Sequence, residues 1–254
     1  MASAAATLMC TLTAGGATPA VDLVPSVGTT PMTLMRLARA IAPARAVRAY
    51  AYSGIDDGTA PHRTIEAIAE ANLAELRAAA PRGPYLIGGH CLGGTVAHAM
   101  AAALEARGEQ VAMLVVIDAI APLPLDHVDD RPAVDSPATA AMAAQIRAIS
   151  ESLSARAVEY QAHVDPEMGQ RIKTVVRLHL DASARYRAPA LRAPIRVLRT
   201  AAYDDAVVQE WDRYSADVSR HTVPGDTVST LRPPYVEATA RVLGRELASA
   251  SRAP

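Results

Sequence analysis

The residues best suited to chemistry in this sequence surround Cys91, in the stretch Gly-Gly-His-Cys-Leu-Gly-Gly at positions 88–94. Gly89 and Gly93 flank the cysteine at the glycine-x-nucleophile-x-glycine spacing. An apolar run at 85–87 comes before this stretch and alanine-rich helix formers follow it, so the backbone must turn sharply from a strand into a helix. Glycines suit such a turn because the two backbones approach closely. The pattern predicts an outward-pointing thiol nucleophile, and the chemistry would be acyl transfer.

The predicted helix would place the Cys91 thiol at its N-terminus, where partial positive charge favours the thiolate. We therefore expect a lowered pKa for this thiol. Cys10 is the only other cysteine, and it lies in a different predicted element, so we expect no disulfide and a reducing, cytoplasmic location. The sequence shows no grouping of cysteine and histidine ligands, and we predict no metal site.

Composition favours one domain over residues 1–254, with enough chain to bury a full core. Hydrophobic residues make up 50% of the chain, charged residues 20%, and the net charge is -1. This balance argues against a nucleic-acid partner or an anionic membrane surface. The apolar start of the chain lacks a basic segment and is too short for a signal or a membrane span, so we expect neither.

Alternating strand and helix patterns would position the cysteine. Apolar runs at 8–13 and 21–24 around two glycines predict an opening hairpin. A helix at 32–41, a strand at 46–52 and a helix at 62–79 come before the turn at Cys91, and a helix at 93–106 follows it. The continuous apolar run at 111–117 is typical of a parallel strand buried on both faces. This order predicts an α/β protein with a mostly parallel, doubly wound sheet.

The pattern changes between about 121 and 188. A proline- and aspartate-rich stretch leads into helical patterns around 138–159 and 167–185, with no strand-like run. Such an insertion between sheet strands predicts a helical lid. Strands are expected again at 195–200 and 218–223, followed by a closing helix at 233–250.

The turn, the order of elements and the lid together resemble the thioesterase domains that release chains from polyketide synthases and nonribosomal peptide synthetases. The resemblance is carried by residues 83–90, by 108–118, by Trp211 and by Val223-Pro224-Gly225-Asp226. It implies an α/β-hydrolase fold, no bound cofactor, and a carrier-protein partner that presents an acyl chain on phosphopantetheine. The nucleophile of this family is usually serine, so Cys91 is a departure from its pattern.

The resemblance also implies roles for residues around the cysteine. Asp118 follows the strand after the nucleophile, where the family keeps the acid that orients its base. Asp204 and Asp205 stand where some relatives keep that acid, or else in a turn. Val27 and Leu92 would lend backbone N–H groups to the oxyanion hole.

A second departure concerns the base. The family's histidine should follow Gly225-Asp226, but Thr227 stands there, as a pocket-lining residue or a weak hydrogen-bond donor. His179, on the last lid helix, and His221, in a late strand, are the possible substitutes. His90 is expected to support the turn from behind, because adjacent strand residues point to opposite faces.

Three aromatic side chains, Tyr186, Tyr203 and Trp211, contact either the acyl chain or the protein core in this interpretation. A thiol can be acylated without a base, whereas water attacking the acyl-enzyme would lack one. We therefore expect release of the chain from Cys91 by an internal nucleophile in preference to hydrolysis. The alternatives are a free-standing editing thioesterase that clears stalled carriers, and a catalytically dead module that only binds.

Overall fold

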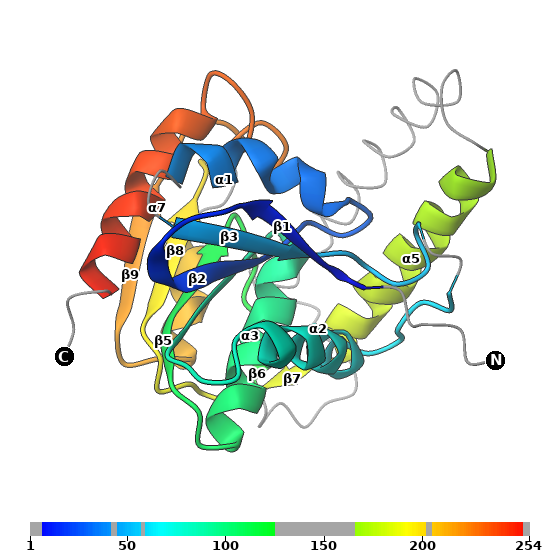
Figure 1. The fold of residues 1–254 in the computed structure, drawn as a ribbon, viewed down its shortest axis with the longest axis horizontal. Coiled ribbons are helices and arrows are strands. Elements are labelled where there is room, and N and C mark those ends of the chain that lie inside the picture. Colours follow the sequence, from blue (N-terminus) through cyan, green and yellow to red (C-terminus); the bar gives the residue numbers. More distant parts are fainter. Residues whose placement is uncertain (1–6, 42–44, 57–58, 125–165, 202–204, 251–254) are drawn as a thin grey trace.

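A seven-stranded sheet forms the centre of the molecule (Figure 1), in the order β1-β3-β2-β4-β5-β8-β9. The computed structural model describes residues 7–41, 45–56, 59–124, 166–201 and 205–250. Neighbouring strands are parallel except for β1 and β3, which are antiparallel. The predicted fold class, a mostly parallel α/β sheet, is therefore confirmed.

The bounds of the elements agree closely with the sequence patterns. The strands of the sheet are β1 (Met9–Thr13), β2 (Ala17–Val24), β3 (Arg45–Tyr50), β4 (Tyr85–His90), β5 (Val111–Ile117), β8 (Ile195–Arg199) and β9 (Val218–Thr222). The helices are α1 (Met35–Ile41), α2 (Ile65–Ala79), α3 (Leu92–Ala106), α5 (Pro166–Arg185), α6 (Asp205–Gln209) and α7 (Val236–Ala250), with 3-10 turns η1 (Pro31–Leu34) and η2 (Glu210–Arg213).

The predicted opening hairpin is wrong, because β3 lies between β1 and β2. β2 and β3 run parallel, with Asp22 opposite Arg48. The Arg48 guanidinium donates to the Asp22 carboxylate at 2.8 and 2.6 Å, and the Tyr50 hydroxyl donates to it at 2.7 Å. A hairpin of β1 with β2 would leave this buried carboxylate without its cation, and an uncompensated buried charge is strongly unfavourable.

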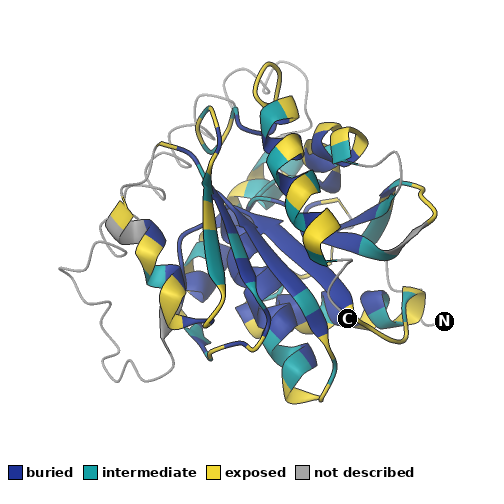
Figure 2. Cartoon of the chain, turned by 90° about the vertical axis from the view of Figure 1, so that its left-hand side faces the viewer, coloured by how far each residue is buried: buried dark blue, intermediate teal, exposed yellow. Residues whose placement is uncertain are grey.

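Helices cover both faces of the sheet. Figure 1 shows α1 and α7 on one side and α2 and α3 on the other. The central strands between them are buried, as Figure 2 shows in dark blue, whereas the edge strands β1 and β9 are only partly covered. Along β4, Tyr85 and Ile87 belong to the core beneath α2 and α3, whereas Leu86 belongs to the core beneath α1 and α7. The two apolar layers hold the C-terminal ends of the strands in place, where the cysteine lies.

The lid segment is described at its two ends. Helix α5 contacts α2 and α3, and a short parallel pair joins β6 (Leu123–Pro124) to β7 (Arg187–Ala188). That pair corrects the expectation of a segment without strands: it ties together the two points where the chain leaves and re-enters the sheet region. The helix predicted around 138–159 lies outside the described residues. No described helix is long and apolar enough to cross a membrane.

Candidate active site

Cys91 occupies a strained turn between β4 and α3. Its backbone has φ 54° and ψ -127°, a conformation that residues other than glycine rarely adopt. A Cβ on Gly89 would lie 2.0 Å from the Gly93 carbonyl oxygen, and one on Gly93 would lie 2.3 Å from the Val24 carbonyl oxygen. Both flanking glycines are therefore required by close backbone contacts. The predicted strand-to-helix turn is confirmed.

The electrostatic expectation for the thiol is wrong. Burial raises the pKa of Cys91 to about 11, although hydrogen bonds from the Ser26 hydroxyl and the Leu92 backbone lower it. The thiol is also covered, with the residue only 1% exposed. A helix N-terminus contributes at most about 1–2 kcal/mol, roughly one pKa unit, and the desolvation of a buried thiolate exceeds that. The sequence shows the helix but not the depth of burial.

The loop after β2 lies beside the cysteine. β2 pairs with β4 so that Val24 is opposite Gly89, which brings residues 25–28 alongside the turn. The buried Val27 belongs to this loop, and Leu92, the first residue of α3, directly follows Cys91. Sequence reasoning missed Ser26, whose hydroxyl contacts the thiol. A hydroxyl residue next to the proline that ends a predicted strand was the available signal.

Asp118 and Thr227 meet although 109 positions separate them. The Thr227 hydroxyl donates to Oδ2 of Asp118. Oδ1 accepts two further hydrogen bonds at 2.8 Å, from the backbone N–H and the hydroxyl of Thr200. Asp118 is 1% exposed and has φ 47°. The carboxylate is therefore fixed and directed at position 227, with a threonine hydroxyl where an imidazole would be oriented.

His90 lies beside Asp118, whereas the alternative acid Asp205 does not. Burial lowers the pKa of His90, and the Asp118 charge and the Thr227 backbone oppose that shift. The imidazole thus lies against the pair Asp118–Thr227, on the side of the sheet where Leu86 also points. Asp205 is exposed and pairs with Arg199 at 2.5 Å, away from this cluster. Asp204 lies outside the described residues.

His179 is buried on helix α5, in the segment predicted to be a lid. It is 1% exposed, and its ring centroid lies 5.0 Å from that of Tyr52. Tyr52 in turn donates to the Pro25 carbonyl at 2.7 Å, and the Cys91 charge contributes to its raised pKa. The structure therefore brings His179 to the neighbourhood of the cysteine through a tyrosine that sequence reasoning missed.

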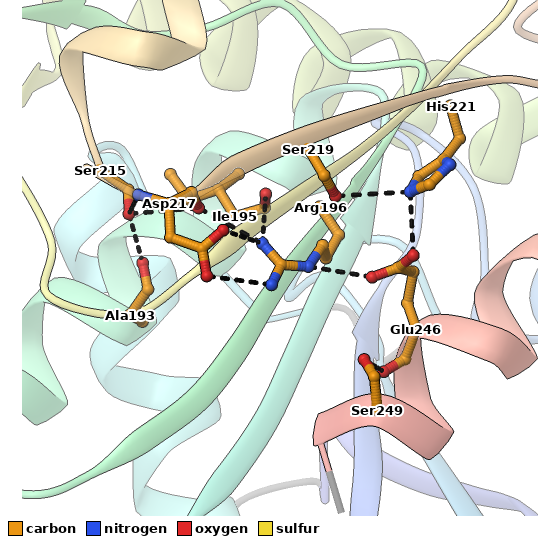
Figure 3. Close-up of polar contacts among 9 residues, drawn as sticks. All are labelled: Ala193, Ile195, Arg196, Ser215, Asp217, Ser219, His221, Glu246 and Ser249. Atoms are coloured by element: carbon orange, nitrogen blue, oxygen red, sulfur yellow. Dashed lines mark hydrogen bonds and ion pairs between the residues drawn. The ribbon is translucent and has the colours of Figure 1, made fainter. Parts of the chain in front are cut away.

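His221 belongs to a polar cluster with Glu246 and Arg196, which Figure 3 shows. Its Nε2 is 2.9 Å from a Glu246 oxygen, and the other oxygen of that carboxylate is 2.9 Å from Arg196 Nε. In the sheet it shares a row with Leu198, Ile117 and His90. Three strand spacings, about 14 Å, therefore separate it from β4. The structure does not bring His221 to Cys91.

The aromatic candidates that are described belong to the core. Trp211 is fully buried and its Nε1 donates to the Ala119 carbonyl at 3.1 Å. The Tyr186 hydroxyl lies 3.2 Å from His98 Nδ1, and the His98 ring also contacts Tyr214 and Trp211. This cluster joins α3, η2 and the end of α5. Tyr203 lies outside the described residues, and no group of metal-binding side chains occurs in the part of the chain that is described.

The fold and the site define the class. A strained strand-to-helix turn between β4 and α3, an aspartate after β5 and a mostly parallel sheet are the features of an α/β-hydrolase fold. Residues 22–247 match the thioesterase domain family, and the chain belongs to that family. The family suggested by the sequence motifs is thus confirmed.

The relatives that the chain matches are much longer proteins, and the chain resembles a small part of each. The chain is 50% identical over 54 residues, 21% of its length, to enterobactin synthase component F of Escherichia coli (strain K12). It is 38% identical over 82 residues, 30% of its length, to malpibaldin synthetase of Mortierella alpina. These matches span 4% and 2% of the relatives' lengths.

A solved structure extends the likeness over nearly the whole chain. The NocB thioesterase domain, in a covalent complex with a fluorophosphonate nocardicin G analog, superposes with a TM-score of 0.71. The match covers 94% of this chain and 99% of that one, at 23% identity. At this identity the comparison supports the shared fold.

Proposed function

We propose that this protein is a chain-releasing thioesterase or acyltransferase that carries its acyl chain on Cys91. The observation that supports this most is the geometry of the turn: a cysteine in a strained conformation, flanked by glycines that backbone contacts require, with the Ser26 hydroxyl and the Leu92 N–H beside its sulfur. In this proposal Val27 and Leu92 provide the backbone donors that stabilise the oxyanion formed during acyl transfer.

The partner in this proposal is an acyl or peptidyl carrier protein, and its phosphopantetheine thioester is the substrate. Membership in the thioesterase domain family and the multidomain synthetases among the relatives support this. In acylation the Cys91 sulfur attacks the thioester carbonyl, the bond to the pantetheine sulfur breaks, and that thiol takes up a proton. One thioester replaces another, so the step is close to neutral in free energy.

Release is the step that the site restricts. Thr227 stands where Asp118 would orient an imidazole, and a threonine hydroxyl that donates to a carboxylate does not accept a proton from water. General-base assistance is worth about 10²–10⁴-fold in rate, so unassisted hydrolysis of the acyl-enzyme is slow. We infer that a nucleophile within the chain releases it preferentially, which yields a cyclic product.

A second candidate is a binding module without catalysis. The raised pKa of the Cys91 thiol favours it, since at pH 7 only about 1 in 10⁴ molecules would carry the thiolate. This thiolate population makes acylation slow at neutral pH and faster as the pH rises. A binding module would show no acylation under any of these conditions.

Mass spectrometry separates the two candidates. The protein is incubated with an acyl thioester of N-acetylcysteamine between pH 7 and 9.5, and the adduct is located by peptide mapping. We expect one acyl group on Cys91, none in Cys91→Ala, and an unchanged adduct in Cys10→Ala, which removes the other cysteine. Absence of any adduct on Cys91 across this range would support the binding module instead.

A further inference from the structure

One face of helix α5 lies directly on the loop beside the nucleophile. Gly28, in the loop after β2, has φ +68°, and a Cβ there would lie 2.4 Å from Val176 Cγ2 and 3.4 Å from Ile172 Cγ2. The helix thus packs on the backbone of residues that flank the oxyanion donors. His179 follows Val176 by three positions and therefore shares its helix face. The face of α5 that rests on this loop therefore also carries His179.

The imidazole of His179 is buried but poorly hydrogen-bonded. Among the described residues, neither ring nitrogen has a hydrogen-bond partner of good geometry, although the residue is 1% exposed. The pKa of His179 is lowered to about 4, first by burial and then by the charge of the nearby His62, and a contact with the His62 backbone opposes this shift. A buried imidazole whose nitrogens are not well hydrogen-bonded destabilises the folded state, so a role outside packing is the better explanation.

Other groups near Cys91 are either hydrogen-bonded or lie on the other face of the sheet; His90 is in the second class, although its buried Nε2 has no hydrogen-bond partner among the described residues. Asp118 accepts hydrogen bonds from Thr200 and Thr227 on its two oxygens. His90 lies against that pair on the opposite face of the sheet from α3 and α5. Tyr52 has a pKa well above its usual range, because it is buried, and its hydroxyl already donates to Pro25.

We propose that His179 is the general base of chain release, an inference that rests on the acyl-Cys91 function proposed above. As a hydroxyl or amine of the bound chain attacks the Cys91 thioester, its proton moves to His179. A C–O or C–N bond forms, the C–S bond to Cys91 breaks, and the proton passes from His179 to the departing sulfur. The imidazole lies on the inner face of α5 and is 1% exposed, so it is shielded from bulk water. It therefore serves a nucleophile of the chain that is bound beneath this helix.

Two acyl chains of equal length distinguish a base from a packing residue. N-acetylcysteamine thioesters ending in a hydroxyl or in a thiol are loaded onto Cys91, and loss of the adduct is followed by intact mass at pH 9. A thiol with pKa about 8.5 is largely ionised there and needs no base, whereas a hydroxyl does. We expect His179→Gln to slow release of the hydroxyl chain by about 10²-fold or more and to leave release of the thiol chain within a few-fold of wild type.

Further variants guard against a folding artefact. His179→Phe keeps a ring against Tyr52 without a proton acceptor and should behave as His179→Gln does. His221→Gln removes a histidine remote from Cys91 and should release both chains at wild-type rates. Equal slowing of both chains in the His179 variants would mark a packing role and overturn the proposal. Wild-type release rates for both chains in the His179 variants would also overturn the proposal, and would leave the acyl-Cys91 function intact. Failure of wild-type Cys91 to acquire either chain would overturn that function and this inference together.

Discussion

Replacing Thr227 with histidine should give the site the hydrolytic base that it lacks. Thr227 lies next to Asp118, whose Oδ1 is held by Thr200 through two hydrogen bonds at 2.8 Å. Removing the threonine hydroxyl frees Oδ2, the oxygen that would then accept from an imidazole at position 227. Because the carboxylate is already oriented, the substitution would, under the proposed function, add the base for hydrolysis that completes a nucleophile–base–acid arrangement.

The size of the gain follows from what a general base contributes, about 10²–10⁴-fold. We expect Thr227→His to fall near the lower end, roughly 10²-fold, because His90 already lies against Asp118 and the Thr227 backbone and restricts the new ring.

The assay is steady-state hydrolysis of a simple acyl thioester without an internal nucleophile, followed by the thiol it releases. Thr227→Val is the matched control: it removes the hydroxyl without adding a base. It should destabilise the fold by about 1–3 kcal/mol, since Oδ2 of the buried Asp118 loses its partner. Equal rates of thioester hydrolysis in Thr227→His and Thr227→Val, with Cys91 acylated in both, would show that a histidine at position 227 does not act as a base oriented by Asp118.

Three further predictions concern the thiol and the loop that covers it. Because burial raises the pKa of Cys91 to about 11, its alkylation by iodoacetamide should rise about tenfold per pH unit from pH 7 to 10, measured by peptide mass; a plateau below pH 8 would contradict the burial argument. Ser26→Ala removes a hydrogen bond that lowers this pKa, so alkylation at pH 8 should slow several-fold, and an unchanged rate would exclude the contact. Gly28→Ala adds a Cβ 2.4 Å from Val176 Cγ2 at a positive φ, so it should lower the melting temperature and speed hydrogen exchange in α5; unchanged exchange would show that the helix does not rest on this loop.

Much of the fold follows from local patterns in the sequence. The strand-to-helix turn at Cys91 was predictable because only glycine tolerates the close backbone contacts at positions 89 and 93. The spacing of the two glycines around the cysteine indicates such a turn directly. The buried strand β5 was equally plain from its unbroken apolar run. Strand pairing was harder: the opening hairpin was predicted from proximity in sequence, while the pairing depends on Asp22 meeting Arg48, 26 positions away.

The site was predictable in its members more than in its electrostatics. Asp118 and Thr227 follow from the family resemblance, and the structure joins them. The sign of the pKa shift on Cys91 was missed because the pattern shows a helix N-terminus and not the depth to which the thiol is buried. Tyr52 was missed for a related reason: its place beside Cys91 depends on the contact of its hydroxyl with Pro25, which no local motif records.

Pre-steady-state kinetics with an acyl thioester that has no internal nucleophile tests most directly whether Cys91 holds chains that water releases poorly. The released thiol is recorded against enzyme concentration at pH 9. We predict a burst of one thiol per Cys91, accompanied by an acyl adduct on that residue, followed by turnover slower than the burst by about 10²-fold or more. Linear, rapid multiple turnover with no burst and no accumulated adduct would contradict the account.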